Sequence, residues 1–362
     1  MTERIRTAVI GTSWWADGAH LPGLRARRDV ELVALCGRDE ARLAQMAGKF
    51  GIPRAFTDYR RMLSEVRPEV VVVSTPNHLH APMTLAALEA GAHVICEKPL
   101  ALTVAEAATM LERAEALRRR HLTFFSYRGM PGPRYVKRLI DSGYIGRPYH
   151  AQAAYLHGSW LDRSRLVEWK TTRAESGSGV LGDLGVHVVD MLQWWIGPIA
   201  RVAGHLATFI AERSRADGSR VPVETDDATA FVGEFAGGGQ ATVQLSRVAA
   251  QRKNFQRFEL YGSEGTIVYE YDQPLAHVGR VFGVRFGEGD LKPLDIPAEL
   301  SQGFAGQDTF PSVYRALTDA FFASLRAPGQ TPAPSFADGL AAQKTIDAVA
   351  RSSESGAWES AN

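Results

Sequence analysis

Strand-sized apolar runs alternate with helical patterns through the first third of the chain, and no other feature constrains the fold as strongly. Four runs are apolar on both faces of a strand: Thr7–Ile10, Val30–Cys36, Val70–Val73 and His93–Cys96. Helical patterns separate them, over residues 20–28, 40–50 and 82–90. Strands of this kind, joined by helices, predict a parallel sheet that is covered on both faces. Such a sheet binds ligands beyond the carboxyl ends of its strands.

The turn after the first run reads Gly11-Thr12-Ser13-Trp14-Trp15-Ala16. Gly11 and Ala16 match the first and third positions of the dinucleotide-binding fingerprint, whereas Ser13 replaces the second glycine, where the backbone approaches the pyrophosphate. Taken alone, these residues fit a plain strand-to-helix turn equally well. Their place directly after the first strand of an alternating pattern favours a nucleotide site, with the phosphates at the helix N-terminus.

The residues after the second run bear on the choice of cofactor. Gly37 and Arg38 stand where an acidic residue would otherwise bind a ribose 2′-hydroxyl. An arginine at this place accommodates a 2′-phosphate, so we expect NAD or NADP with a mild preference for NADP. The alternatives are that Arg38 stacks on the adenine or points into solvent.

The fourth run ends in Glu97-Lys98-Pro99. Two charged residues thus close a buried strand at the edge where parallel sheets place their ligands. A lysine at a strand end is often only solvated, but Pro99 restricts the backbone of Lys98 and could aim its side chain. Lys98 is therefore a candidate for the chemistry.

An apolar stretch of helical length, residues 182–196, carries three polar residues at a regular spacing. Asp183, His187 and Asp190 fall at i, i+4 and i+7, which places them on one face of a helix. So apolar a segment should be mostly buried, where an unpaired carboxylate or imidazole is costly. The pattern predicts either a functional site or an internal hydrogen-bond network, and Asp183 could instead complement the helix N-terminus. We expect Asp190 to be structural.

The rest of the chain has the pattern of a second domain. Short runs between Gly-rich turns predict strands at 149–155, 229–235, 240–247, 255–261 and 266–271, with hairpin connections at 237–239 and 262–265. Helical patterns cover 133–142, 313–324 and 336–352. We expect a loop at 212–220, and the pattern assigns no element to 287–307.

Length and composition exclude several classes of protein. With 362 residues the chain exceeds the usual size of a single core, so two domains are expected. A formal net charge of +1 gives no excess of positive charge that would indicate binding to nucleic acid or to an anionic membrane. Cys36 and Cys96 lie in apolar runs and predict core residues in a reducing compartment. Without a secretion signal or an apolar stretch of membrane-spanning length, we expect a cytoplasmic protein. No set of His78, His80, His93 and His157 has a convincing metal-ligand spacing, so no metal site is expected.

Together these motifs resemble the glucose–fructose oxidoreductase, inositol dehydrogenase and rhizopine-catabolism family (Gfo/Idh/MocA). The resemblance rests on residues 9–12, 74–80, 91–99 and 182–187. Its specific part is Glu97-Lys98-Pro99 followed by Asp183 and, four residues later, His187. Weaker matches are 127–128, 169–170, 224–227 and 334–340, and the clear departure is Ser13. The matches run through almost the whole chain in the family's order.

The resemblance implies an α/β fold with two domains. Residues 1–126 would form an NAD(P)-binding Rossmann domain with a parallel sheet, and residues 127–362 an α/β domain with a large, mainly antiparallel, open-faced sheet. The second domain would bind substrate and form homodimers or homotetramers through its sheet. Similar proteins transfer a hydride between NAD or NADP and a secondary alcohol or ketone of a sugar, a sugar derivative or a cyclic polyol.

Carried over to this sequence, the family pattern makes Lys98 the active-site lysine, Asp183 the substrate-binding carboxylate and His187 the acid/base. Together with the positions argued above, the expected cofactor contacts are Gly11, Thr12, Ser13, Trp14, Trp15, Gly37, Arg38, Thr75, Pro76, Asn77, His80, Glu97 and Lys98. The expected substrate contacts are Lys98, Arg128, Trp169, Lys170, Asp183 and His187.

These residue types suit the oxidation of an alcohol. An imidazole titrates near pH 6.5, so His187 is the best candidate to remove the hydroxyl proton. Lys98 would stabilise negative charge on the same oxygen, and Asp183 would bind a neighbouring hydroxyl. Two alternatives remain open: a nucleotide-binding sugar sensor without turnover, and an enzyme that uses transient oxidation for glycoside cleavage.

Overall fold

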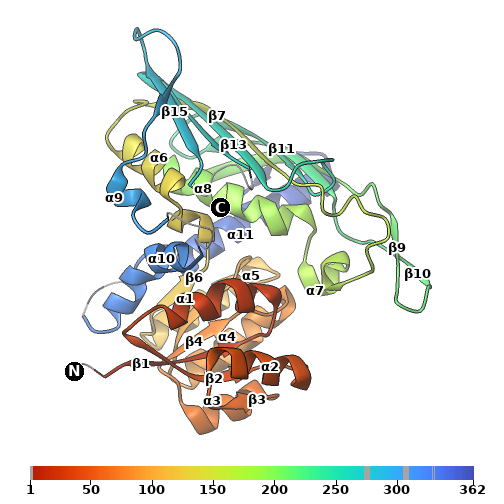
Figure 1. Cartoon of the computed structure of the whole chain (residues 1–362). Coiled ribbons are helices and arrows are strands. Elements are labelled where there is room, and N and C mark those ends of the chain that lie inside the picture. The colour runs from red at the N-terminus through yellow and green to blue at the C-terminus, as the bar shows by residue number, and fades with distance from the viewer. Residues whose placement is uncertain (1–2, 273–277, 305–309, 328, 330) are drawn as a thin grey trace. The chain divides into compact units, whose positions relative to one another are not determined.

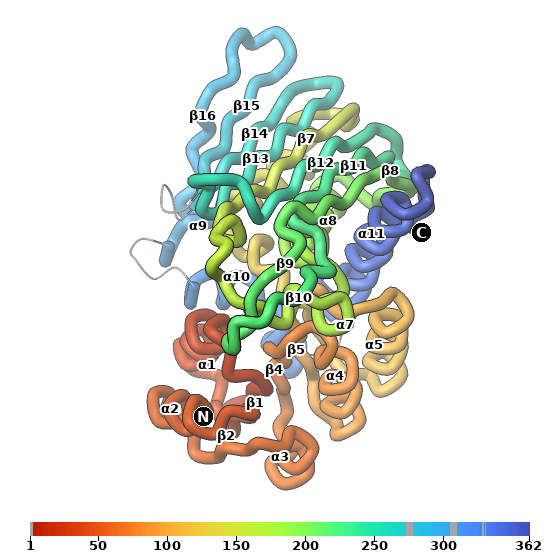
Figure 2. The backbone as a smooth tube through the Cα atoms, turned by 90° about the vertical axis from the view of Figure 1, so that its right-hand side faces the viewer, coloured from red at the N-terminus to blue at the C-terminus, as the bar shows by residue number. Residues whose placement is uncertain are grey.

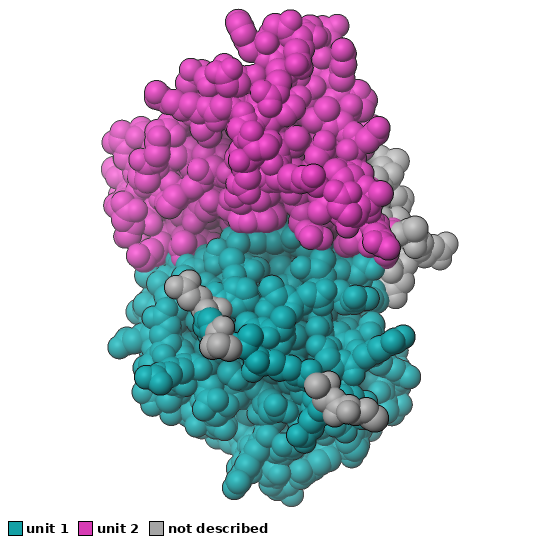
Figure 3. Space-filling view, turned by 90° about the vertical axis from the view of Figure 1, so that its left-hand side faces the viewer, with its two compact units in different colours: residues 1–129, 306–340 teal, residues 130–305, 341–362 magenta. Residues whose placement is uncertain are grey.

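The computed structural model describes residues 3–272, 278–304, 310–327, 329 and 331–362. The chain forms two compact units, shown in different colours in Figure 3. Unit 1 consists of residues 1–129 and 306–340, and unit 2 of residues 130–305 and 341–362.

Unit 1 is built on a six-stranded sheet in which every pairing is parallel. Its order is β3-β2-β1-β4-β5-β6, the arrangement of a doubly wound dinucleotide-binding fold. The strands are β1 (Ile5–Ile10), β2 (Val30–Cys36), β3 (Ala55–Phe56), β4 (Val70–Val73), β5 (His93–Cys96) and β6 (His121–Thr123). The four strands predicted from the apolar runs are confirmed, three of them with the predicted bounds.

Helices cover both faces of this sheet, and Figure 2 shows α1 and α2 on one side with α4 and α5 on the other. They are the π-helical turn η1 (Ala16–His20), α1 (Leu21–Arg25), α2 (Glu40–Phe50), α3 (Tyr59–Val66), the 3-10 turn η2 (Asn77–Leu79), α4 (His80–Glu89), α5 (Val104–Ala116), the 3-10 turn η3 (Ser126–Gly129) and α10 (Phe310–Ser324). The side chains of β4 alternate between two cores. Val70 and Val72 pack in the core with α1, α2 and α10, and Val71 and Val73 in the core with α3, α4 and α5.

Local side-chain bonds begin several of these helices. Asp39 and Asp58 accept N–H bonds in the first turns of α2 and α3. Thr103 and Glu106 form a reciprocal capping box at the start of α5. Each satisfies backbone donors that a helix cannot pair internally.

Unit 2 is built on a nine-stranded mixed sheet in the order β16-β15-β14-β13-β7-β12-β11-β8-β17. Figure 2 shows the strands from β16 to β8 side by side. Strands β7 and β12 pair in parallel and the other neighbours antiparallel. The strands are β7 (Pro148–Leu156), β8 (Ile199–Ala207), β11 (Ala228–Phe235), β12 (Gln240–Ser246), β13 (Phe255–Gly262), β14 (Gly265–Tyr271), β15 (Arg280–Arg285), β16 (Lys292–Leu294) and β17 (Glu359–Ser360). The mainly antiparallel sheet and its two predicted hairpins are confirmed.

Helices α6 (Pro131–Asp141), α8 (Val186–Trp195) and α11 (Phe336–Ser355) lie along one face of this sheet (Figure 1). The chain passes from unit 1 to unit 2 within α11. On β12, Ala241, Val243 and Leu245 are buried while residues 240, 242 and 244 are exposed. One face of the sheet therefore packs against the helices, and this strand presents the other to solvent.

Two expectations for unit 2 need correction. Residues 212–220, predicted as a loop, contain β9 (Glu212–Ser214), which pairs antiparallel with β10 (Arg220–Pro222). Three-residue strands are too short to show a period of two, so their polar composition suggested a loop. Between 287 and 304 lie β16 and the short helix α9 (Ala298–Ser301), where no element was assigned, and 305–307 lie outside the described residues.

Gly11 shows how closely the backbone is packed at the end of β1. Its φ is +127°, and an added Cβ would stand 1.9 Å from the carbonyl oxygen of Ser74, after β4. The ends of β1 and β4 are neighbours at the point where the strand order reverses, which is where such sheets bind dinucleotides.

We expect Gly11→Ala to lower the free energy of unfolding by roughly 3 kcal/mol or more, since it adds both backbone strain and a steric overlap. Gly18 provides the matched control, because an added Cβ there would meet nothing within 4 Å. Gly18→Ala should leave stability unchanged or raise it by about 0.5–1 kcal/mol. Urea unfolding followed by circular dichroism measures both; equal effects would contradict the close approach at Gly11.

Candidate active site

The predicted site residues fall into two groups, one in each unit. Residues 11–15, 37–38, 75–77, 80, 97–98 and 128 belong to unit 1, and residues 169–170, 183 and 187 to unit 2. Each group is built by its own unit.

The loop after β1 shows what Ser13 does at the position where the fingerprint has its second glycine. The Ser13 Oγ accepts a hydrogen bond of 3.1 Å from the N–H of Ala16, so Ser13 caps the helix that begins at Trp14. Thr12 contacts the loop after β2, because an added Cβ at Gly37 would stand 2.4 Å from the Thr12 methyl. The Ser13 hydroxyl thus serves the helix, and Gly37 is required by the close approach of two loops. Arg38, next to it, is exposed.

Trp14 and Trp15 begin the same helix and have different surroundings. Trp14 is 72% exposed. Trp15 lies edge-on to Trp14 and to Phe310 of α10, each with ring centroids 5.2 Å apart. The next turn, η1, is π-helical, a form that is rare and often found at functional sites.

Glu97 is the centre of a buried polar cluster in unit 1. Its Oε1 accepts hydrogen bonds from Trp15 Nε1 (2.6 Å) and from His20 Nε2 (2.7 Å), while Oε2 accepts from the N–H of Lys98 (3.2 Å). Burial raises the pKa of the Glu97 carboxyl, but the hydrogen bond and charge of His20, with Lys98 and Trp15, outweigh it and hold that pKa below its ordinary value. The carboxylate therefore attaches the helix after β1 to the end of β5.

His20, fully buried, is a site residue that the sequence did not reveal. It comes 77 positions before Glu97, and no local pattern marks the pairing. Only the adjacency of β1, β4 and β5 brings the two together.

His80 joins the loops that follow β4 and β5. Its ring is fully buried, with Nδ1 2.8 Å from the Pro99 carbonyl oxygen and Nε2 3.0 Å from that of Thr75. Burial lowers the pKa of His80, and the two carbonyls offset this only in part. The neutral ring donates to one of these two carbonyls, and it packs between the loop at Thr75 and the backbone at Pro99, next to Lys98.

Arg128 is buried in unit 1 and paired with an acidic residue near the end of the chain. Its Nη2 donates to Asp338 Oδ1 at 2.9 Å, and its guanidinium lies over the Phe125 ring. Asp338 Oδ2 in turn accepts from the N–H of Ser335. Two of the weaker motifs, 127–128 and 334–340, are thus joined by an ion pair.

In unit 2 the predicted helix at 182–196 begins differently from expectation. Its first turn, η5 (Leu181–Gly185), is π-helical and carries Asp183, and α8 follows with His187 and Asp190. A period of 3.6 therefore does not hold through its first turn. His187 and Asp190 are buried, at 6% and 3% exposure, whereas the Asp183 side chain is 24% exposed.

Asp183 pairs with Lys170, another predicted substrate residue. The Lys170 Nζ donates to Asp183 Oδ2 at 2.7 Å, with both side chains about a quarter exposed. Lys170 lies in the 3-10 turn η4 (Trp169–Thr171), and its ammonium is 5.5 Å from the Trp169 ring. The structure thus brings Trp169, Lys170 and Asp183 together, with the side chains of Lys170 and Asp183 partly exposed.

His157, directly after β7, belongs to the same surroundings although the sequence gave it no role. Burial lowers the pKa of His157 to about 4, a shift that Asp183 opposes and Lys170 reinforces. The ring is therefore neutral near pH 7. Ser159 Oγ lies 3.1 Å from its Nδ1.

The described residues contain neither a cluster suited to a metal ion nor a helix suited to spanning a membrane. No group of three or more His, Cys, Asp or Glu side chains is arranged to hold a metal ion there. No helix in the described part of the chain combines the length and apolarity needed to cross a membrane.

Comparison with known proteins assigns the family. A model of an oxidoreductase family with an NAD-binding Rossmann fold matches residues 5–125, and one of the GFO/IDH/MocA C-terminal domain matches residues 134–268. The chain belongs to the Gfo/Idh/MocA family. It is an oxidoreductase of the dehydrogenase and reductase type, and the predicted family and fold are confirmed.

Similar proteins extend over most of the chain. Levoglucosan dehydrogenase from Pseudarthrobacter phenanthrenivorans is 32% identical over 344 residues, covering 87% of this chain and 85% of that protein. The crystal structure of an oxidoreductase domain protein from Kribbella flavida has a TM-score of 0.90 and 30% identity, covering 100% of both chains. A levoglucosan dehydrogenase in complex with NADH and L-sorbose has a TM-score of 0.91 and 27% identity over 99% of each chain.

We expect Glu97→Gln to lower the free energy of unfolding by roughly 3 kcal/mol at pH 7, because the amide removes the negative charge beside His20 and replaces an acceptor by an NH2 group, against either the N–H of Lys98 or the donors of Trp15 and His20. The fold lowers the pKa of the Glu97 carboxyl below its ordinary value of 4.5. The ionised carboxylate therefore stabilises the fold above pH 4.5, and this stabilisation is lost as the pH falls through the pKa of the folded state. The gap between wild type and variant should therefore persist down to about pH 4.5 and narrow below it.

Chemical denaturation between pH 7 and pH 3 measures this gap. Glu89→Gln is the control, since Glu89 forms an exposed ion pair with Arg113 and should contribute little. A gap that widens below pH 4.5 would contradict the assignment.

Proposed function

We propose that this protein oxidises or reduces a secondary alcohol or ketone of a sugar, a sugar derivative or a cyclic polyol with NAD or NADP. The observation that carries the proposal is the ion-paired, partly exposed Asp183 one turn before the buried His187. A carboxylate that can reach ligand hydroxyls thus stands beside a potential proton acceptor. Support comes from the levoglucosan dehydrogenase similar to this chain, whose name states a sugar-type substrate.

The residues of unit 1 fit a dinucleotide. Gly11 leaves no room for a side chain where β1 and β4 end, and a helix begins at Trp14, three residues later. Residues 11–15, 37–38, 75–77, 80 and 97–98 would hold NAD(P) there. When bound, the nicotinamide provides the hydride acceptor or donor. We further propose that cofactor binding belongs to residues 1–126, and substrate binding and oligomerisation to residues 127–362.

In this proposal His187 accepts the hydroxyl proton during oxidation and returns it during reduction. Lys98 places a positive charge at the alcohol oxygen and stabilises its developing negative charge. Asp183 binds a neighbouring hydroxyl, assisted by Lys170, while Arg128 and Trp169 complete the substrate contacts. No observation favours the sensor or the transient-oxidation enzyme considered from the sequence.

We expect His187→Ala and Lys98→Ala each to reduce turnover by about a hundred- to ten-thousand-fold while the cofactor still binds. Absorbance of the reduced nicotinamide, recorded over a panel of levoglucosan, glucosides, inositols and their keto forms, measures turnover. The controls His205→Ala and Lys137→Ala change an exposed histidine and a lysine on α6, and both should retain full activity. Near-normal turnover of both His187→Ala and Lys98→Ala would refute the catalytic roles.

The preference for NADP is a finer proposal, based on Arg38. This exposed guanidinium follows Gly37 after β2, where an acidic residue would otherwise bind a ribose 2′-hydroxyl. Titration followed by tryptophan fluorescence should show tighter binding of NADP than of NAD, and Arg38→Ala should reduce or abolish the difference. Tighter binding of NAD by the wild type would overturn the preference.

We also propose a cytoplasmic homodimer or homotetramer that associates through the nine-stranded sheet. Support comes from the exposed alternate residues of β12, which leave this part of the sheet face uncovered within the chain. The mass of the purified protein in solution would test the assembly.

A further inference from the structure

The start of the helix that carries Asp183 is bonded to one buried carboxylate. Asp226, 4% exposed, accepts hydrogen bonds from the N–H of Gly179 (2.6 Å, Oδ1) and of Leu181 (2.9 Å, Oδ2). Its backbone carbonyl accepts from the N–H of Val180 at 2.9 Å. A helix has no internal acceptors for its first N–H groups, so Asp226 satisfies three in succession.

The contact at Gly179 has no room for adjustment. An added Cβ at Gly179 would stand 2.0 Å from the Asp226 carbonyl oxygen. Asp226 Oδ2 also accepts from Thr229 Oγ1 at 2.8 Å, which holds the carboxylate in orientation. The position of the first helical turn is therefore set by residue 226.

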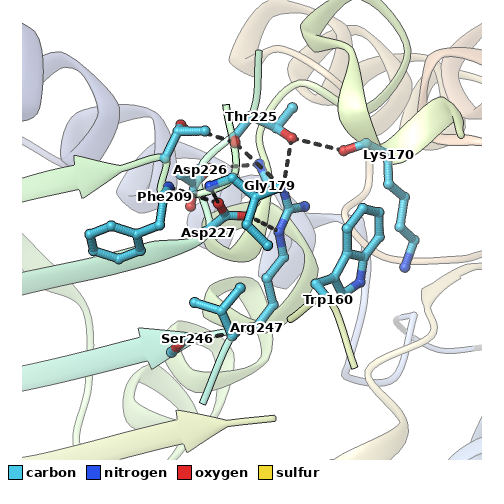
Figure 4. A network of polar contacts seen from close by, with 12 residues as sticks. Trp160, Lys170, Gly179, Phe209, Thr225, Asp226, Asp227, Ser246 and Arg247 are labelled. Atoms are coloured by element: carbon cyan, nitrogen blue, oxygen red, sulfur yellow. Dashed lines mark hydrogen bonds and ion pairs between the residues drawn. The ribbon is translucent and has the colours of Figure 1, made fainter. Parts of the chain in front are cut away.

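The preceding residue, Thr225, is bonded to the partner of Asp183. Its Oγ1 donates to the backbone carbonyl of Lys170 at 2.9 Å (Figure 4). The N–H of Glu224 donates to the Thr171 carbonyl at 3.0 Å. Two hydrogen bonds therefore attach the segment 224–225 to η4. Thr225 is 1% exposed, and these bonds are shielded from solvent.

The next residue, Asp227, holds the segment 225–227 in place. Arg247 Nε donates to Asp227 Oδ1 at 2.9 Å, and Arg247 Nη2 donates to Thr225 Oγ1 at 3.1 Å. Both Asp227 and Arg247 are buried, and the guanidinium lies 4.2 Å from the Trp160 ring (Figure 4). Asp227 Oδ2 also accepts from the N–H groups of Phe209 and Ile210, each at 2.8 Å. An ion pair so fully bonded is a rigid support.

We propose that Thr225 and Asp226 are positioning residues that set the geometry of the Lys170–Asp183 pair. Asp226 fixes the turn that bears the carboxylate, and Thr225 fixes the backbone that bears the ammonium. Because they are consecutive, the two attachments move together and the 2.7 Å contact is held from both sides. The inference rests on the proposed function, in which Asp183 binds a substrate hydroxyl.

The sharpest test is the near-isosteric change Thr225→Val, which removes the hydroxyl that bonds Lys170. We expect kcat/KM to fall about tenfold to a hundredfold, as for other small displacements of positioning groups. The affinity for NADH should be unchanged, because its proposed site is in unit 1. Thr225→Ser retains the hydroxyl and should restore kcat/KM to near the wild-type value. Asp226→Asn, which puts amide hydrogens against helix N–H donors, should lower kcat/KM at least as much as Thr225→Val.

Ser352→Ala is the control that distinguishes a loss of positioning from a loss of stability. Ser352 is a buried residue of unit 2 whose Oγ accepts from the N–H of Gly204 and donates to the Ala357 carbonyl. This control should lower the melting temperature and leave kcat and KM unchanged. The substrate is the most rapidly oxidised member of the levoglucosan, glucoside and inositol panel. A crystal structure of Thr225→Val, in which the Lys170–Asp183 distance should exceed 4 Å, provides a readout that needs no turnover.

The outcomes distinguish this inference from the proposed function. If Asp183→Asn keeps full activity, the proposed substrate role of Asp183 is wrong. If Asp183→Asn is inactive while Thr225→Val keeps wild-type kcat and KM and the 2.7 Å pair, the positioning inference is overturned. Loss of kcat/KM in Thr225→Val with recovery in Thr225→Ser supports it.

Discussion

In each unit a buried carboxylate accepts hydrogen bonds from several donors at the start of one helix. The arrangement of the site residues depends on these bonds. Glu97 accepts from Trp15 and His20 in unit 1, and Asp226 accepts from Gly179 and Leu181 in unit 2. Burying a carboxylate is costly unless it is fully hydrogen-bonded, so each of these helices has one position in which the charge is satisfied. A displaced helix would leave both the charge and its own N–H groups without partners.

Both of these helices contain a π-helical turn, η1 in unit 1 and η5 in unit 2. Such a turn changes the angular spacing of side chains and so redirects those that precede it relative to those that follow. In unit 2 the turn carries Asp183, which stays partly exposed while His187 in the next turn is buried. The local geometry thus separates a side chain that can meet a ligand from its buried neighbour.

The charged side chains of the site differ in how they are fixed. Lys170 and Asp183 are paired with each other. The backbone carbonyl of Lys170 is bonded to Thr225, and the start of the helix that carries Asp183 is bonded to Asp226. The segment of Lys98 is held by Glu97 and packs against His80, whose Nδ1 lies 2.8 Å from the Pro99 carbonyl oxygen. The backbones of Lys98 and Lys170 are thus fixed, although a lysine side chain is flexible. A fixed backbone limits the positions that each ammonium group can take, so less ordering is needed when a ligand binds.

The amino-acid sequence by itself determined the parallel and antiparallel sheets, most long elements and the family, because apolar periodicity and turn residues are local properties. The bounds of β2, β4 and β5 follow directly from their apolar runs. Strands of two or three residues, such as β3, β9 and β10, carry too few side chains for a period to appear. The residues that would do the chemistry were likewise named from motif and residue type.

Only the tertiary structure decided which polar groups support them. His20 and Glu97 are 77 positions apart, and Asp226 and Gly179 are 47 apart, so no local pattern links them. The π turn at Asp183 was also beyond a periodicity argument, and its first N–H, that of Leu181, is bonded to the distant Asp226. Burial makes such long-range bonds obligatory, but which partners meet is settled by how the strands and helices pack.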